Sequence, residues 1–136
     1  MIFALDSRLA ADTSLIGDLP LSRALLMNDA RYPWAILVPH RAGLVEISEL
    51  TPEERAQLME ETVLVAQAIS ALPEVEKINV GALGNIVRQL HVHVVGRRVG
   101  DAAWPGPVWG KGAAEPYEAA AREARLGWIR ARLALI

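Results

Sequence analysis

The stretch that decides the fold is residues 89–95, which read Gln89-Leu90-His91-Val92-His93-Val94-Val95. Polar and apolar residues alternate along it, and successive side chains of a β-strand point to opposite faces of the sheet. We therefore expect a strand from Gln89 to Gly96 whose apolar face packs on the core. The other face carries Gln89, His91 and His93 as a polar strip. Such groups need hydrogen-bonding partners when buried, so a cleft over this face is expected.

A long helix is predicted upstream of this strand. Thr51-Pro52-Glu53-Glu54 combines an N-cap residue, a proline suited to the first helical position and a glutamate that can complete a capping box. The helix should end near Pro73. We expect its apolar residues to form one buried stripe, which consists of Leu58, Met59, Thr62 (weakly), Val63, Ala66 and Ile69.

Shorter elements flank this helix. Residues 25–27 and 34–38 are apolar runs on either side of a polar turn with a proline, which predicts a hairpin. Residues 77–81 predict a further strand, and the alanine-rich segment 117–135 predicts a terminal helix, whereas residues 5–21 stay undecided. Most connections are too short for parallel crossovers, so the pattern favours an α+β domain with a mainly antiparallel sheet.

The bulk composition excludes several classes of function. A chain of 136 residues holds one domain, which we expect to span 1–136 with its core at 21–98 and a loop and helix at 99–136. The net charge of −2 argues against a nucleic-acid partner, which requires clustered Lys and Arg. The absence of cysteine excludes a thiol nucleophile. No stretch reaches the roughly 20 apolar residues of a membrane helix, and the N-terminus is unlike a secretory signal, so we expect a cytoplasmic protein.

Two histidines on one strand face indicate phosphoryl chemistry. A neutral imidazole is nucleophilic near pH 7 and can attack phosphorus when its other ring nitrogen donates to a fixed acceptor. A second histidine can bind the phosphoryl oxygens. The glycine-containing loop at residues 81–85 can supply backbone N–H groups that stabilise negative charge. We therefore predict that a phosphate binds over residues 81–85, close to His91 and His93.

Residues 89–95 resemble the signature of the histidine triad (HIT) family, His-φ-His-φ-His-φ-φ with φ apolar, except that Gln89 stands in place of the first histidine. Residues 79–88 are similar to the strand and phosphate loop of that family, and the resemblance covers about residues 21–98. It implies a five-stranded sheet with the long helix on one face and a C-terminal helix. It also implies a homodimer, which four tryptophans and an apolar C-terminal segment favour.

The resemblance also implies roles for individual residues. His91 would be a nucleophile that forms a covalent nucleotidyl-histidine intermediate, which water then hydrolyses. The backbone carbonyl of Gln89 would orient its ring, and His93 would contact the phosphate. The implied substrate-binding residues are Asn28, Asn79, Gly84 and Asn85. The implied substrates are nucleotides or nucleotide conjugates, such as nucleoside phosphoramidates or dinucleoside polyphosphates, and no cofactor is implied.

Three interpretations stay open at this stage. The favoured one is a nucleotidyl hydrolase or transferase. A second is a nucleotide-binding module with little or no turnover, because glutamine cannot exchange a proton as histidine does. A third is a metal-dependent enzyme, because His-x-His on a strand is also a zinc-ligand pair. Its third ligand is missing, since the remaining histidine, His40, has no reason to converge, so we expect no metal site. We expect Arg97 and Arg98 to be exposed charges.

Overall fold

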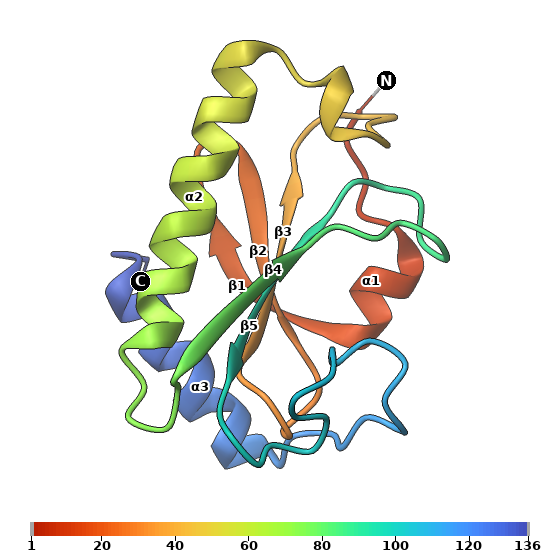
Figure 1. Ribbon diagram of the computed structural model, residues 1–136. Helices are drawn as coiled ribbons and strands as arrows, with labels where there is room; N and C mark the ends of the chain where they lie inside the picture. The colour runs from red at the N-terminus through yellow and green to blue at the C-terminus, as the bar shows by residue number, and fades with distance from the viewer. Residues whose placement is uncertain (1, 136) are drawn as a thin grey trace.

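The structure is a computed structural model that describes residues 2–135. Within this range the elements are α1 (Ser7–Asp12), β1 (Thr13–Asp18), β2 (Ser22–Met27), β3 (Trp34–Pro39), a short 3-10 helix (Ile47–Glu49), α2 (Pro52–Ser70), β4 (Lys77–Gly81), β5 (Val92–Arg97) and α3 (Ala119–Arg132). The described strands form one antiparallel sheet in the order β1-β2-β3-β5-β4. Figure 1 shows α2 and α3 beside each other, with α1 on the other side of the sheet. The predicted α+β class and five-stranded sheet are confirmed.

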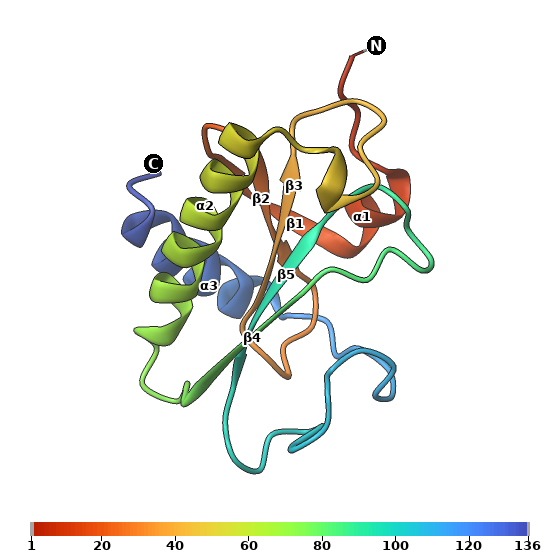
Figure 2. The same cartoon turned by 45° about the horizontal axis from the view of Figure 1, so that its top comes forward.

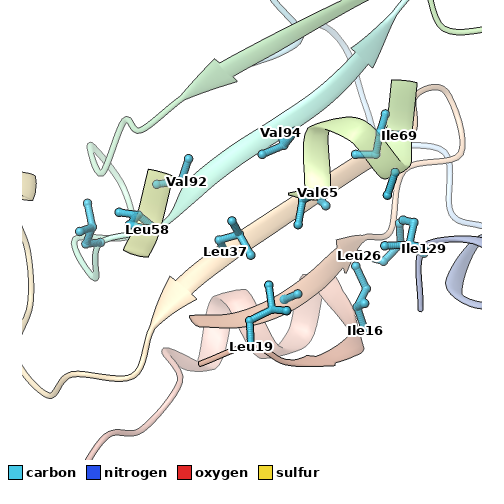
Figure 3. Packing of buried hydrophobic residues seen from close by; sticks show 14 of the residues in the cluster. Ile16, Leu19, Leu26, Leu37, Leu58, Val65, Ile69, Val92, Val94 and Ile129 are labelled. Atoms are coloured by element: carbon cyan, nitrogen blue, oxygen red, sulfur yellow. The ribbon is translucent and has the colours of Figure 1, made fainter. Parts of the chain in front are cut away.

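Each face of the sheet carries its own hydrophobic cluster. The larger cluster lies under α2 and α3 and joins residues such as Leu58 and Ile69 to Leu37 and Val94 of the sheet (Figure 3). The second cluster lies on the opposite face and includes Leu9 of α1 together with residues of the loop after β5. Figure 2 shows α1 and that loop on the side of the sheet away from α2. The face of the sheet that carries the predicted polar strip is therefore the face of the second cluster.

The predicted alternation is confirmed for residues 90–95. Leu90, Val92 and Val94 are buried in the larger cluster, whereas Val95 belongs to the second. The strand itself is shorter than expected, because β5 begins only at Val92. The stretch before it lies outside the strand ladder, although the backbone N–H of Leu90 donates to the carbonyl of Leu44 at 2.9 Å.

The predicted N-terminus of α2 is confirmed, but its predicted buried stripe is partly wrong. Thr51 caps the helix and Glu54 completes the capping box. Met59 is 62% exposed and Val63 is 41% exposed, and the buried face instead consists of Leu58, Glu61, Thr62, Val65, Ala68 and Ile69. Polar residues fit on this face because they are hydrogen-bonded there. The carboxylate of Glu61, for example, accepts from the Leu21 backbone N–H at 2.7 Å.

The elements near both termini, within residues 2–135, pack onto the sheet. The undecided segment 5–21 forms α1 and β1, and β1 lies before the expected core range and supplies one edge of the sheet. The predicted terminal helix is confirmed as α3. Its Arg130 fixes α3 against β1 by donating to the backbone carbonyls of Leu15 and Ile16 at 2.7 and 2.8 Å. No helix within residues 2–135 combines the length and the apolar character needed to cross a membrane.

Arg97 is buried, contrary to the prediction that it is an exposed charge, whereas Arg98 is exposed as predicted. The guanidinium group of Arg97 donates to both carboxylate oxygens of Asp101 at 2.8 and 2.9 Å. It also donates to the side-chain oxygen of Asn79 at 2.8 Å and to the carbonyl of Gly106 at 2.9 Å. These acceptors compensate the desolvation of the charge, and most belong to the loop after β5, which the sequence pattern did not connect to the strand.

This ion pair predicts a large difference in stability between two neighbouring arginines. Arg97→Met leaves the buried carboxylate of Asp101 without its partner, and we expect the free energy of unfolding to fall by about 3–5 kcal/mol. Arg98→Met is the matched control on an exposed side chain and should change it by less than about 0.5 kcal/mol. Urea denaturation at pH 7 measures both values, and equal effects of the two substitutions would contradict the prediction.

Candidate active site

His91 lies in a cleft of about 430 Å³ on the second face of the sheet, and its side chain is only 6% exposed. Its Nδ1 atom is 2.6 Å from the backbone carbonyl oxygen of Gln89. A carbonyl oxygen can only accept a hydrogen bond, so Nδ1 carries the proton in the neutral ring. The Nε2 atom of neutral His91 therefore has an unshared electron pair.

His93 lines the same cleft, and its ring is held in the opposite tautomer. The indole Nε1–H of Trp34 donates to the Nδ1 of His93 at 3.0 Å. An indole N–H can only donate, so Nδ1 accepts and the proton of the neutral ring resides on Nε2. Burial, together with the nearby charge that His91 acquires on protonation, lowers the pKa of His93 from 6.5 to about 3. His93 is therefore a neutral hydrogen-bond donor beside His91, with the ring centroids 4.8 Å apart.

Two tryptophans form an aromatic wall of the cleft. The ring of Trp109 meets the ring of His93 edge-on at 5.3 Å and that of Trp34 at 6.4 Å. Gly81 leaves room for this indole, because a Cβ at Gly81 would come within 3.0 Å of the Trp109 ring. Gly81 therefore leaves space for the aromatic wall, and the residues of the predicted phosphate loop that line the cleft are Leu83, Gly84 and Asn85. Gly84 has a φ of +74°, a backbone conformation that favours glycine.

An ion pair borders the cleft near the turn between β2 and β3. Arg31 contacts the carboxylate of Asp29 at 2.9 Å and also donates to the backbone carbonyl of Lys111 at 2.8 Å. Burial alone would raise the pKa of Asp29, but the hydrogen bonds from Arg31 hold that pKa below its ordinary value. The carboxylate therefore stays charged and keeps Arg31 in place. Arg31 in turn ties the loop after β5, including Lys111, to the rim of the cleft.

The cleft collects four of the residues singled out from the sequence, which are His91, His93, Gly84 and Asn85. Asn28 and Asn79 do not line it. The side-chain oxygen of Asn28 accepts from the backbone N–H of Tyr117 at 2.9 Å, and that of Asn79 accepts from Arg97. Both oxygens thus have partners within the protein, and the predicted substrate contacts of these two residues stay predictions.

The side chain of Gln89 faces the N-terminal segment of the chain. Its Oε1 accepts from the backbone N–H of Asp6 at 2.8 Å, and its Nε2 donates to the carbonyl of Ala4 at 2.9 Å. Only its backbone carbonyl meets His91. The sequence placed this side chain on the histidine strip, because strand alternation was extended over residues that precede β5.

Several residues of the cleft were not identified from the sequence, among them Trp34, Trp109, Arg31 and Lys111. Trp34 was predicted only as part of a buried strand, and its bond to His93 follows from the pairing of β3 with β5. Trp109 lies in a Pro- and Gly-rich loop without periodicity. This loop is held in place by the hydrogen bonds of the buried Arg97 to Asp101 and Gly106. Such tertiary contacts leave no periodic pattern in the sequence.

His40 lies apart from the two cleft histidines. Its Nε2 is 3.1 Å from the carboxylate of Asp18, and it does not line the cleft. In residues 2–135 no three side chains of His, Cys, Asp or Glu are grouped closely enough to hold a metal ion. Within the described part of the chain, His91 and His93 thus offer an electron pair and a hydrogen-bond donor, and no third metal ligand is grouped with them.

The low pKa of His93 predicts how stability depends on pH. In the folded protein this pKa is about 3, below the 6.5 of an unperturbed histidine, so the native state binds fewer protons than the unfolded chain. The stability is therefore retained above pH 6.5 and lost as the pH falls from 6.5 toward 3, at up to about 1.4 kcal/mol per pH unit. Urea denaturation at several pH values should show that His93→Phe removes this contribution. Titration of His93 near pH 6.5 in ¹⁵N NMR spectra would contradict the assignment.

The comparisons with known proteins agree with this fold. A histidine triad protein from Bradyrhizobium japonicum is 45% identical, with a TM-score of 0.94 over 97% of this chain and 98% of that chain. A histidine triad protein from Sinorhizobium meliloti 1021 is 53% identical (TM-score 0.93, 96% of each chain), and one from Marinobacter aquaeolei VT8 is 42% identical (TM-score 0.95, 98% of each chain). No curated protein matches the chain significantly. The HIT domain matches residues 8–100, and the chain therefore belongs to the HIT family.

Proposed function

We propose that this protein is a nucleotidyl hydrolase or transferase in which His91 is the nucleophile. The observation that carries the proposal is the 2.6 Å contact between Nδ1 of His91 and the carbonyl of Gln89, which leaves an electron pair on Nε2 inside the cleft. This pair attacks the phosphorus atom of the nucleotide. A P–N bond forms while the bond to the leaving group breaks, and its electron pair departs with that group. Water then attacks the phosphorus, and the P–N bond breaks with its electron pair returning to Nε2 of His91. The proton that the water loses passes to solvent, the nucleotide is released and His91 is restored.

The neighbours of His91 suit the charge that develops on phosphorus. His93 offers its Nε2–H to a phosphoryl oxygen, and because its pKa is about 3 it acts there as a neutral hydrogen-bond donor. The backbone of the loop that holds Gly84 and Asn85 adds further donors on the same side. The apolar wall formed by Trp34 and Trp109 offers a surface for the nucleoside. The phosphate then lies between the histidines and residues 84–85.

Substitution of the nucleophile tests this function directly. After the protein is mixed with an adenosine phosphoramidate or a dinucleoside polyphosphate and quenched, intact-mass spectrometry should detect one added nucleotidyl group on His91. His91→Gln should abolish this adduct and lower turnover by about 10³-fold or more, because no other side chain on the strip can form the intermediate.

His40→Gln is the matched control, since it removes a histidine that lies outside the cleft. It should retain the adduct and the turnover of the unsubstituted protein. Turnover that persists in His91→Gln contradicts the covalent mechanism. Tight nucleotide binding without adduct or product instead supports a nucleotide-binding module with little turnover.

We also infer that two copies of the chain pair through β4. The features that first favoured a dimer are largely packed within the chain. Of the four tryptophans, Trp34 is 6% exposed and the other three are half-buried, and Ile129 of α3 is fully buried. Three of the exposed apolar residues, Ile47, Met59 and Val80, lie together beside β4, which is an edge strand of the sheet. Val80 is 53% exposed and borders an apolar groove with Met59. An unpaired strand edge beside apolar side chains is suited to antiparallel pairing with the same edge of a second copy.

Charge substitutions at this edge test the homodimer. We expect analytical ultracentrifugation at micromolar concentration to show a dimer that Val80→Lys, alone or with Met59→Lys, converts to a monomer. Burial of an unpaired ammonium group at an apolar interface is unfavourable. Leu15→Lys, on the other edge strand β1, is the control and should remain dimeric. A monomer for the unsubstituted chain contradicts the inference.

A further inference from the structure

The N-terminal segment of the chain is bonded directly to the residue that orients His91. The side-chain amide of Gln89 accepts from the N–H of Asp6 at 2.8 Å and donates to the carbonyl of Ala4 at 2.9 Å. These contacts join positions separated by more than 80 residues in the chain. The same residue offers its own backbone carbonyl to Nδ1 of His91 at 2.6 Å.

Gln89 needs such an anchor because the sheet does not hold it. β4 ends at Gly81 and β5 begins at Val92, so Gln89 lies in a stretch outside the strand ladder. The peptide group between Gln89 and Leu90 is fixed on one side by the bond from the Leu90 N–H to Leu44. The amide contacts fix Gln89 on its other side. Both constraints determine where its carbonyl points, and hence how the ring of His91 is oriented.

A primary amide suits this task better than an imidazole. Its oxygen can accept from the N–H of Asp6 while its nitrogen donates to the carbonyl of Ala4. The N–H and the C=O of one residue in a parallel strand bond in the same way to two positions of the neighbouring strand that are two residues apart. The two nitrogens of an imidazole point apart. A histidine at position 89 could therefore satisfy Asp6 or Ala4, but not both.

A second contact ties the same N-terminal segment to the phosphate loop. Arg8 donates to the backbone carbonyl of Ile86 at 3.1 Å, and its guanidinium group is held by the carboxylate of Asp6 at 3.1 and 3.2 Å. Residues 4–8 therefore contact the chain at Ile86 and at Gln89. Along the chain, both contact points lie after the cleft-lining residues Gly84 and Asn85 and before His91.

We propose that residues 4–8 and the side chain of Gln89 form an N-terminal clasp that positions His91, with Gln89 as a positioning residue rather than an acid, a base or a substrate ligand. The proposal rests on the proposed function in so far as His91 is the nucleophile. It assigns a role to the N-terminal segment, which supplies backbone groups to the site without lining the cleft. It also assigns Gln89 a task that the first histidine of the family signature cannot perform here.

Gln89→Met tests the clasp, because methionine has a similar length and no charge but cannot form either amide contact. We expect faster hydrogen exchange at the Asp6 amide and, in ¹⁵N NMR spectra, loss of the single Nδ1–H tautomer of His91. With an adenosine phosphoramidate or a dinucleoside polyphosphate, kcat should fall about 10- to 100-fold, since a misplacement of about 1 Å has effects of that size. KM should change less than about two-fold, because the cleft walls are intact.

The controls separate positioning from a general effect on folding. Gln67→Met replaces an exposed glutamine of α2 and should leave exchange, tautomer and kcat unchanged. Arg8→Gln removes the exposed contact with Ile86 and should show a smaller loss in kcat, and it replaces Gln89→Met if that variant does not fold. Gln89→His should lower kcat as Gln89→Met does, although it restores the family signature.

The outcomes distinguish this proposal from the proposed function. Faster exchange at Asp6 with an unchanged His91 tautomer and unchanged kcat would show that the contacts only stabilise the N-terminus, and would overturn the clasp. An increase of kcat in Gln89→His would overturn it as well. If the unsubstituted protein has no turnover, the proposed function fails, and the His91 tautomer in Gln89→Met still decides the clasp.

Discussion

The side chains of β5 cannot shift by one residue without exchanging the two faces of the sheet. Val92 and Val94 lie in the cluster under α2, so His93 must point to the other face, and His91 follows it there. Pairing on both sides strengthens this constraint, because β5 lies between β3 and β4. Ile36 and Gly81 are the residues opposite His93 in the two neighbouring strands. The location of the cleft is therefore a consequence of how the core is packed.

The sequence predicted those features that depend on neighbouring residues. The cap at Thr51, the hairpin of β2 and β3, and the two faces of residues 90–95 all follow from patterns within a few positions, and the structure confirms them. The buried face of α2 was partly missed, because Glu61 has its hydrogen-bond partner 40 residues away. A polar residue with a distant partner is indistinguishable in the sequence from a polar residue that faces solvent.

The same limit explains what could not be predicted about the candidate site. The histidines and the glycine loop form a local motif, so the sequence located them. The aromatic wall depends on the loop after β5, whose attachment through Arg97 and Asp101 is visible only once both are buried. Every residue at position 89 supplies a carbonyl, but the amide of Gln89 also joins the site to the start of the chain. No periodicity reports such contacts, since the intervening segments contain most of the fold.

Two histidines separated by a single residue thus acquire opposite properties from their partners. The carbonyl of Gln89 accepts from Nδ1 of His91, whereas the indole of Trp34 donates to Nδ1 of His93. One ring is left with an electron pair on Nε2 and the other with a proton there. A phosphoryl group needs both, because its phosphorus accepts an electron pair and its oxygens accept hydrogen bonds. The tautomers are set by a backbone carbonyl and by a neighbouring strand, so the chemistry of the pair is determined by the fold around it.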